Sequence, residues 1–369
     1  MRRSPMHRLL RSLQASLVIA AIVVLSAPQL QADDVEDFVV ARMQEQHLPG
    51  VAFAVLRRGE VLRSEALGFA SLELRAPVSS GTIFQIGSLT KQFTARAVLL
   101  LADEGKLRLT DPIRKFVPDV PVSWNRITLY HLLTHTSGVP NWVGMEEFSF
   151  HSDYTSRQFL AIFADKPLDF APGERFKYSS AGYSLLTFAI EKASGMPFSD
   201  FLRVRLFEPA GMHATSVNDS ETVLAGRAEG YVVRNGAIYN GVNLRPRITA
   251  PSGAVLSTID DLARWESVLL AGKDLLPESR ALVVRPVKLN GGNTFHYGLG
   301  WYLRDAAKSD IVYHTGTTSA GFRSAYFRDL PSGITVIFLC NASGDGVEPL
   351  PIAESVARMY IERFQPVSQ

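Results

Sequence analysis

Strand-like segments lie at both ends of this 369-residue chain, and this arrangement limits its fold more than any other feature. Two apolar runs near the N-terminus, residues 51–56 (VAFAVL) and 61–69, flank a short turn that contains Gly59. Runs rich in β-branched and aromatic residues on either side of a turn predict paired strands. Near the C-terminus, three more strands are predicted over residues 311–314, 322–327 and 334–339. We therefore expect the two ends of the chain to combine in one antiparallel sheet.

Helical patterns occupy most of the chain outside these strands. They cover residues 35–46, 84–105, 127–134, 183–194, 198–206, 258–270 and 352–364. The helix over residues 258–270 has the clearest start, because Thr258 can cap it and two aspartates follow in its first turn. The sequence thus predicts a sheet assembled from the termini, with a mostly helical insertion between them.

The first residues have the pattern of an export signal. Arginines at positions 2, 3, 8 and 11 precede the apolar run LVIAAIVVL at residues 17–25, which is short for a membrane span. Ala32 offers a cleavage site, although Leu30 is large for its place there. We predict a signal peptide over residues 1–32 and one domain over residues 33–369, in the periplasm or secreted. The alternative is an uncleaved segment, which would then be the chain's contact with a membrane.

Cysteine content and charge narrow the possibilities further. Cys340 is the only cysteine and lies in the apolar run ITVIFLC, so the chain has no internal disulfide and the thiol is expected to be buried. No cysteine stands near the predicted cleavage site, which excludes a lipoprotein. The 38 basic and 36 acidic residues nearly balance, and no basic block follows the N-terminus. Nucleic acid is therefore not expected as a partner.

The only S-x-x-K pattern in the chain joins Ser88 to Lys91 at the start of the apolar helix predicted over residues 84–105. Residues three apart share a helix face, so the hydroxyl and the amine can meet. A serine hydroxyl is a weak nucleophile until a base removes its proton, and a lysine can be that base where burial lowers its pKa. The alternative is an N-cap serine beside a solvated lysine, and the pattern alone does not decide between them.

Two other stretches carry groups suited to the same chemistry. Tyr178, in APGERFKYSSAGYSLL, could relay a proton as a phenol or act as a phenolate. His314 opens the sequence HTGT at a predicted strand end, where Gly316 permits close approach of a substrate. The Thr317 backbone N–H could join that of Ser88 in an oxyanion hole. The alternatives are a tyrosine packed under a loop and a surface histidine.

Together these stretches resemble the serine β-lactamase and penicillin-binding protein superfamily. The likeness is closest to the group of class C β-lactamases, D-alanyl-D-alanine carboxypeptidases, D-amino-acid peptidases and related esterases, and it covers roughly residues 35–364. Further supporting stretches are FQIGSLTKQFTA, LADEGKLRLTDPI, ITLYHLLTHTSGVP, SGAVLSTIDDLARW and HTGTTSAGFRS. The resemblance implies an α/β (α+β) fold of the β-lactamase/transpeptidase-like type. Its antiparallel sheet would have about five strands flanked by the terminal helices, with a helical region beside it.

The resemblance also implies roles for individual residues. Ser88 would be the acylated nucleophile, while Lys91 and Tyr178 would share the general-base and general-acid work. His314, Thr315 and Gly316 would flank the acyl group and bind the substrate's carboxylate side. No metal or cofactor is implied. Outside these roles, His135 in LLTHTSG is expected to pack and form hydrogen bonds, and Asn141 and Trp142 are expected to line the cleft.

The chain departs from the family pattern at three places. Ser180 stands where the tyrosine motif usually has asparagine, and a hydroxyl offers fewer hydrogen bonds than an amide. His314 stands where class C enzymes usually have lysine, which weakens attraction for a substrate carboxylate. One extra residue separates Gly316 from Gly321, which suggests a bulge after the strand. Arg304 or Arg323 could bind a carboxylate instead, although surface salt bridges are the expectation for both.

These observations predict an exported serine hydrolase that forms an acyl-enzyme at Ser88. Its substrate would be an amide or ester from a small molecule or from peptidoglycan: a β-lactam, a D-amino-acid peptide or a short acyl ester. The alternative is a penicillin-binding sensor or scaffold with little turnover, which the serine at position 180 keeps open. A purely structural protein would require the Ser88, Lys91, Tyr178 and His314 patterns to be coincidental.

Overall fold

The computed structural model describes residues 32–142, 145–149, 152, 154–163, 165–219, 221–242, 250–304 and 310–364. The predicted signal peptide therefore lies outside the described residues, except for Ala32, which begins the first helix. In the ranges given above, no helix combines the length and the apolar character needed to cross a membrane.

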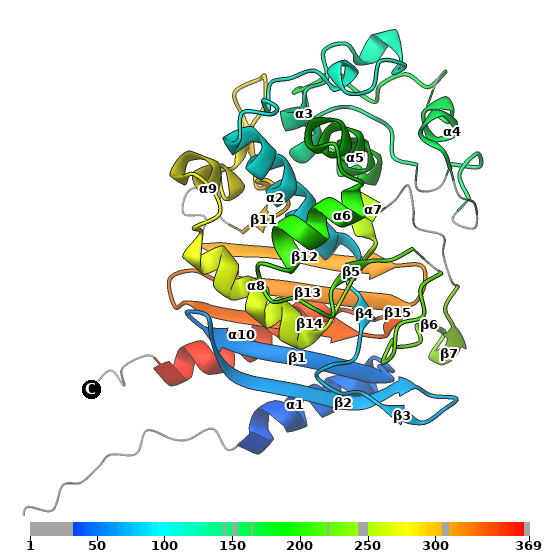
Figure 1. Ribbon diagram of the computed structural model, residues 1–369. Coiled ribbons are helices and arrows are strands. Elements are labelled where there is room, and N and C mark those ends of the chain that lie inside the picture. The colour runs from blue at the N-terminus through cyan, green and yellow to red at the C-terminus, as the bar shows by residue number, and fades with distance from the viewer. Residues whose placement is uncertain are drawn as a thin grey trace, which may run out of the picture.

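A seven-stranded sheet forms the centre of the molecule, in the order β11-β12-β13-β14-β1-β2-β3 (Figure 1). Its long strands are β1 (Gly50–Arg57), β2 (Glu60–Ser71), β12 (Ile311–Thr318), β13 (Phe322–Asp329) and β14 (Ile334–Cys340), and β11 (Tyr302–Leu303) and β3 (Ala76–Pro77) are short edge strands. The N-terminal and C-terminal parts meet where β1 pairs antiparallel with β14, Val51 opposite Cys340. The prediction of one antiparallel sheet built from both ends is confirmed.

The extra residue before Gly321 does not form a bulge. The pairing of β12 with β13 keeps one register from Ile311 opposite Asp329 to Thr318 opposite Phe322. The extra residue lies instead in the turn over residues 319–321, where Gly321 has a φ of +91° that favours glycine. The expected bulge was wrong because a turn can lengthen without disturbing the ladder, whereas a bulge would twist the strand beside the cleft.

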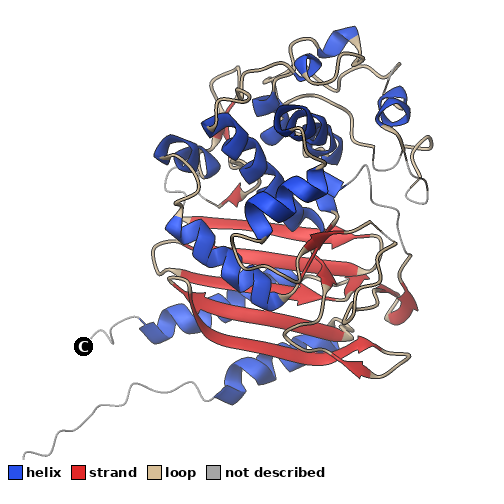
Figure 2. Ribbon diagram, in the orientation of Figure 1, coloured by secondary structure: helices blue, strands red, loops and turns tan. Residues whose placement is uncertain are grey.

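Each face of the sheet has its own apolar cover. Along β1, alternate residues belong to two separate hydrophobic clusters, so that Ala52 faces one cluster and Phe53 the other. The terminal helices α1 (Ala32–Glu45) and α10 (Pro349–Phe364) cover the Phe53 face, while α8 (Ile259–Ala271) and the helical region cover the Ala52 face (Figures 1 and 2). The site described below lies on the second face.

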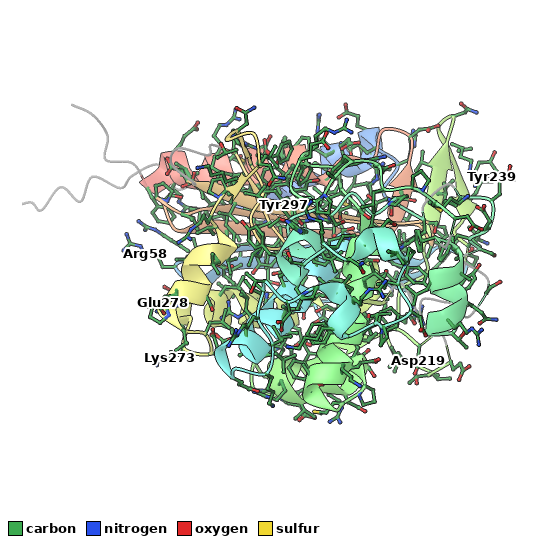
Figure 3. All side chains as sticks on the ribbon, turned by 90° about the horizontal axis from the view of Figure 1, so that it is seen from above. Arg58, Asp219, Tyr239, Lys273, Glu278 and Tyr297 are labelled. Carbon is green, nitrogen blue, oxygen red and sulfur yellow. The ribbon has the colours of Figure 1, made fainter. Side chains whose placement is uncertain are left out.

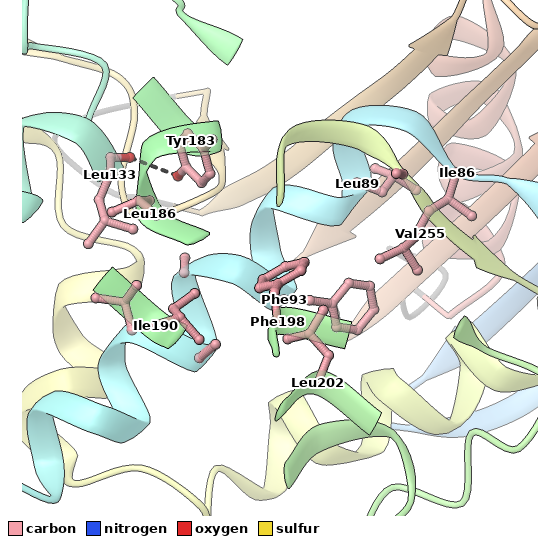
Figure 4. Packing of buried hydrophobic residues seen from close by; sticks show 14 of the residues in the cluster. Ile86, Leu89, Phe93, Leu133, Tyr183, Leu186, Ile190, Phe198, Leu202 and Val255 are labelled. Carbon is pink, nitrogen blue, oxygen red and sulfur yellow. Dashed lines mark hydrogen bonds between the residues drawn. The ribbon is translucent and has the colours of Figure 1, made fainter. Parts of the chain in front are cut away.

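The helical region surrounds α2 (Thr90–Asp103), which is buried from Thr90 to Leu101. The surrounding helices are α3 (Leu129–Leu133), α4 (Ser156–Ala161), α5 (Ser180–Ser194), α6 (Phe198–Leu202), α7 (Ala250–Gly253) and α9 (Pro277–Val283); shorter turns are η1 (Gly87–Leu89), η2 (Ile113–Lys115), η3 (Val122–Trp124) and the π-helical η4 (Arg203–Phe207). Figure 4 shows Phe93 of α2 packed near Phe198 and Leu202 of α6. This packing fixes the first turn of α2 within the helical region.

The helix predicted over residues 84–105 begins later than expected. Phe84–Gln85 form the short strand β4, which pairs with β8 (Val255–Ser257), and η1 and α2 follow. The remaining short strands are β5 (Ser216–Val217), β6 (Tyr231–Arg234), β7 (Ala237–Asn240), β9 (Val287–Lys288), β10 (Thr294–Phe295) and β15 (Ala342–Gly344). Pairing with β8 fixes the chain immediately before Ser88.

Candidate active site

The Ser88 turn lies directly against strand β12. Gly87 has a φ of +55°, and a Cβ atom there would lie 2.7 Å from the Thr317 backbone nitrogen. A Cβ atom on Gly316 would lie 2.0 Å from the Ile86 carbonyl oxygen. Two glycines are therefore needed for this close approach. It brings Gly87, the residue before Ser88, against the backbone of Thr317. An oxyanion hole built from the Ser88 and Thr317 N–H groups would require such an approach.

Hydrogen bonds from three elements fix the turn before Ser88. The Ile86 N–H donates to the Val255 carbonyl oxygen at 3.1 Å, and the Ser324 hydroxyl of β13 donates to the Ile86 carbonyl oxygen at 2.8 Å. The Thr90 hydroxyl in turn accepts from the Val255 N–H at 3.1 Å. The position of the Ser88 hydroxyl is thus set by the fold before any substrate binds.

Lys91 projects from the first turn of α2 into this site and has no exposed surface. Its Nζ lies 3.0 Å from Ser88 Oγ and donates to the Ser252 carbonyl oxygen of α7 at 2.6 Å. Burial lowers the pKa of Lys91 well below its usual value, because a buried ammonium loses its hydration. The alternative of a solvated lysine is therefore wrong, and a neutral amine can accept the Ser88 proton.

Tyr178 forms the opposite wall of the site. Lys91 Nζ lies 4.8 Å from the centre of its ring. Burial raises the pKa of Tyr178 well above its usual value, and a hydrogen bond to the Ser88 side chain opposes this rise in part. The tyrosine is therefore a neutral phenol at neutral pH.

His314 lies on β12 and is only 1% exposed, so the alternative of a surface histidine is wrong. Its Nε2 is 3.3 Å from the Tyr297 hydroxyl, and its Nδ1 is 2.7 Å from the Thr315 carbonyl oxygen. Burial, and secondarily the charge of Lys91, lower the pKa of His314 to about 3. The group at the usual lysine position is accordingly uncharged at neutral pH.

Ser180 is the first residue of α5 and is held by Asn141 rather than by Lys91. The Asn141 Oδ1 atom accepts from the backbone N–H groups of Ser180 and Ala181, at 3.1 and 3.4 Å. Lys91 forms its hydrogen bonds with Ser88 and Ser252. Asn141 therefore lies at the start of α5, while Trp142 is buried and stacked on Phe148.

Both arginines considered as carboxylate ligands are paired elsewhere. Arg304 forms an ion pair with Glu354 of α10, on the opposite face of the sheet. Arg323 Nη1 lies 2.8 Å from Glu348 Oε1 and also donates to the Val347 carbonyl oxygen. The prediction that both arginines form salt bridges is confirmed.

Two residues of the site were not singled out from the sequence. Ser252 supplies a backbone carbonyl, which leaves no signal in a side-chain pattern. Tyr297, in FHYGLGW, has no exposed surface and contacts both His135 and His314. Across the described part of the chain, no group of three or more His, Cys, Asp or Glu side chains could hold a metal ion.

Comparisons with known proteins agree with this geometry. The Beta-lactamase family matches residues 35–357. Penicillin-binding protein 4* of Bacillus subtilis (strain 168) is 30% identical over 311 residues, an alignment that covers 78% of this chain and 67% of that protein. Protein flp of Staphylococcus aureus (strain N315) is 25% identical over 320 residues, which cover 84% of this chain and 62% of that protein. The chain thus spans about two thirds of the length of these relatives.

A solved structure supports the fold independently. The octameric penicillin-binding protein homologue from Pyrococcus abyssi superposes with a TM-score of 0.76 at 27% sequence identity, covering 90% of this chain and 78% of that one. The family match extends from α1 into α10 and includes the strands and helices that carry Ser88, Lys91, Tyr178 and His314. This chain belongs to the Beta-lactamase family.

Proposed function

We propose that the protein is an exported serine hydrolase that cleaves an ester or amide through an acyl-enzyme on Ser88. The observation that carries the proposal is the fully buried Lys91, whose Nζ lies 3.0 Å from Ser88 Oγ. A lysine kept neutral by burial is a base at the pH where a serine hydroxyl needs one. The membership of the Beta-lactamase family supports the same reaction class.

In the proposed reaction, Ser88 Oγ attacks the carbonyl carbon and its proton passes to Lys91 Nζ. The N–H groups of Ser88 and Thr317 stabilise the negative charge that develops on the carbonyl oxygen. Tyr178, a neutral phenol, protonates the leaving group and regains its proton from Lys91. A water molecule then attacks the acyl carbon, which releases the acid and restores the Ser88 hydroxyl.

We propose an uncharged short acyl ester as the preferred substrate class. His314 is neutral where a lysine would attract a carboxylate, and Arg304 and Arg323 are engaged with glutamates elsewhere. Ser180 lacks the amide that would hold an acylamino group. These features disfavour β-lactams and D-amino-acid peptides, which carry both groups. The second candidate, a penicillin-binding sensor or scaffold with little turnover, is favoured by the same Ser180.

The test compares the mature chain with Ser88→Ala on a chromogenic cephalosporin, a D-Ala-D-Ala peptide and a p-nitrophenyl short-chain ester. The proposal expects ester hydrolysis that Ser88→Ala abolishes. Ser184→Ala is the matched control, since the Ser184 hydroxyl is buried on α5 without a hydrogen-bond partner among the described residues. Stable labelling by a fluorescent penicillin without turnover would favour the sensor. Ester hydrolysis that persists in Ser88→Ala would refute the proposal.

A further inference from the structure

Four hydrogen bonds in series connect the two sides of the candidate active site. Tyr178 lies on one side, and Thr317 of strand β12 lies on the other. The Ser179 N–H donates to His135 Nδ1 at 3.1 Å, and His135 Nε2 lies 3.2 Å from the Tyr297 hydroxyl. The same hydroxyl lies 3.3 Å from His314 Nε2, and His314 Nδ1 lies 2.7 Å from the Thr315 carbonyl oxygen. Tyr297 lies near the centre of the molecule when it is seen from above (Figure 3). The three side chains are essentially without exposed surface.

The two ends of this series determine where every proton lies. The Ser179 N–H can only donate, so His135 Nδ1 accepts and the proton of a neutral His135 is on Nε2. The Thr315 carbonyl can only accept, so His314 carries its proton on Nδ1 and its Nε2 accepts. The Tyr297 hydroxyl then accepts from His135 and donates to His314. Tyr183 also lies within hydrogen-bonding reach of this hydroxyl, but its own hydroxyl donates to the Leu133 carbonyl oxygen at 2.8 Å. All four bonds therefore run in one direction, and each donor and acceptor of the series has a partner.

We infer that His135 and Tyr297 are positioning residues that hold His314 in its Nδ1–H tautomer. They thereby fix the position of Tyr178 relative to Thr317 on the other side of the site. The tautomers follow from the hydrogen-bond geometry alone, whereas the catalytic consequence rests on the function proposed above. Hydrogen bonds in such a series strengthen one another, so the loss of one member disturbs the others.

The first end of the series holds Tyr178 in place. His135 adopts a left-handed backbone conformation, with a φ of +57°. Its carbonyl oxygen accepts from the Lys177 N–H at 3.0 Å, and its Nδ1 accepts from the Ser179 N–H. The residues on both sides of Tyr178 are therefore hydrogen-bonded to His135. The centres of the His135 and Tyr178 rings lie 4.3 Å apart. Tyr178 cannot shift without breaking contacts with His135.

The other end of the series fixes the strand that carries Thr317. Orientation repeats every second residue in a strand, so the Thr315 carbonyl and the Thr317 N–H point toward the same edge of β12. The hydrogen bond from His314 to Thr315 therefore restrains the backbone two residues before the proposed oxyanion donor. The series sets the position of this donor relative to the Tyr178 hydroxyl.

The groups around the series favour its neutral form. Burial, together with the nearby Lys91, lowers the pKa of both His135 and His314. The other titratable groups that face it are Tyr178, Tyr183 and Tyr302, whose pKa values are all raised by burial. No carboxylate contributes to the pKa of either histidine. Both imidazoles are therefore neutral at neutral pH, as the series requires.

Long-range proton–nitrogen NMR of the mature protein labelled with ¹⁵N-histidine tests the inference directly at neutral pH. Single variants His135→Gln and His314→Gln assign the two ring patterns. The expected spectrum shows His314 protonated on Nδ1 and bare on Nε2, and His135 the reverse. A His314 ring that is protonated on Nε2, or on both nitrogens, would overturn the inference. The result does not depend on any enzymatic activity.

Tyr297→Phe removes only the bridging hydroxyl, and Tyr313→Phe is the matched control. Tyr313 is the neighbour of His314 on β12, and its ring stacks on Tyr302 without a hydrogen bond from its hydroxyl to a described residue. We expect Tyr297→Phe to shift the Nε2 signals of both histidines and to lower kcat of the Ser88-dependent reaction by about tenfold to a hundredfold, with little change in KM. Tyr313→Phe should change neither.

The outcomes separate this inference from the proposed function. The predicted tautomers in a protein that hydrolyses nothing would support the hydrogen-bond series and refute the hydrolase. Ser88-dependent turnover with the opposite tautomer on His314 would support the hydrolase and refute the hydrogen-bond series. If Tyr297→Phe keeps both tautomer signals and full kcat, then the hydroxyl does not position His314 and the inference fails.

Discussion

Lys91 Nζ lies 3.0 Å from Ser88 Oγ at the end of a side chain that has no contact with solvent. The carbonyl oxygen of Ser252 occupies one donor of the amine, which directs the nitrogen toward the hydroxyl. Hydration normally holds a lysine in its charged form, and burial removes this hydration. The apolar character of α2 beyond Lys91 is therefore part of the candidate site, because the burial that it provides lowers the pKa of the proposed base.

Lys91→Arg should abolish activity although it keeps a long basic side chain at this position. A guanidinium stays protonated in proteins and cannot accept the Ser88 proton. General-base catalysis contributes about 10²- to 10⁴-fold, so we expect kcat/KM to fall by about that factor. Steady-state kinetics on the ester substrate measures this. If Lys91→Arg retained most of the activity, no neutral amine would be needed at this position and the proposed base would be wrong.

Acid should destabilise the protein partly through His314. The pKa of His314 is about 3 in the folded protein, against about 6.5 in an unfolded chain. Between these values only the unfolded state binds the proton, so the free energy of unfolding falls as the pH falls from 6.5 toward 3. One such histidine contributes a loss of about 2 kcal/mol at pH 5.

Urea unfolding at pH 7 and at pH 5 checks this contribution. The difference between the two free energies should shrink by about 2 kcal/mol in His314→Gln. It should not change in His213→Gln, which replaces an exposed histidine. An unaltered difference in His314→Gln would mean that the folded protein protonates His314 readily.

Gly316→Ala should disrupt the Ser88 turn. The added Cβ would lie 2.0 Å from the Ile86 carbonyl oxygen and 2.3 Å from Ser324 Oγ, so the turn and the strand must separate. We expect a loss of at least about 3 kcal/mol in stability and of nearly all activity. Gly291→Ala is the control, because a Cβ there meets no atom of the described residues within 4 Å. Thermal unfolding and ester hydrolysis are measured on both variants. Equal stability and activity of Gly316→Ala and Gly291→Ala would contradict the account.

Much of the fold could be predicted because its long elements have strong local patterns. The apolar runs of β1 and β14 are buried on both faces of the sheet, and Thr258 caps α8 by accepting from the Asp261 N–H at 3.1 Å. The start of α2 could not be predicted, because β4 exists only through its pairing with β8, distant in sequence. Strands of two or three residues carry too few side chains to show a period.

In the candidate site, too, some contacts follow from local sequence and others depend on the complete fold. Ser88 and Lys91 lie three residues apart, so their meeting follows from helix geometry. Tyr297 lies far in sequence from His135, and their contact needs the complete fold. Ser252 contacts Lys91 through its backbone carbonyl oxygen, and a contact of this kind does not depend on the type of residue. Sequence patterns therefore indicate the proposed reacting groups, and the groups proposed to position them emerge from tertiary structure.

Glu266→Ala should cost about 3–5 kcal/mol in stability, as expected when one partner of a buried ion pair is removed. Glu266 belongs to α8, is 1% exposed and lies 3.0 Å from Arg328 Nη2. It also accepts from Tyr326 and Thr335, at 2.8 and 3.1 Å. Chemical unfolding measures the loss, with Glu278→Ala on the exposed start of α9 as the control. A loss under about 1 kcal/mol for Glu266→Ala would contradict the expectation.

The most direct test of the account is mass spectrometry of the intact mature protein, sampled within seconds to minutes of adding the p-nitrophenyl ester. The account predicts an added acyl mass that maps to the peptide containing Ser88, that disappears as the substrate is consumed, and that is absent in Ser88→Ala. The Ser184→Ala control should acquire and lose the adduct like the wild type. Acylation of another residue, or ester hydrolysis without any adduct in a Ser88→Ala protein, would contradict the central claim that Ser88 is the nucleophile.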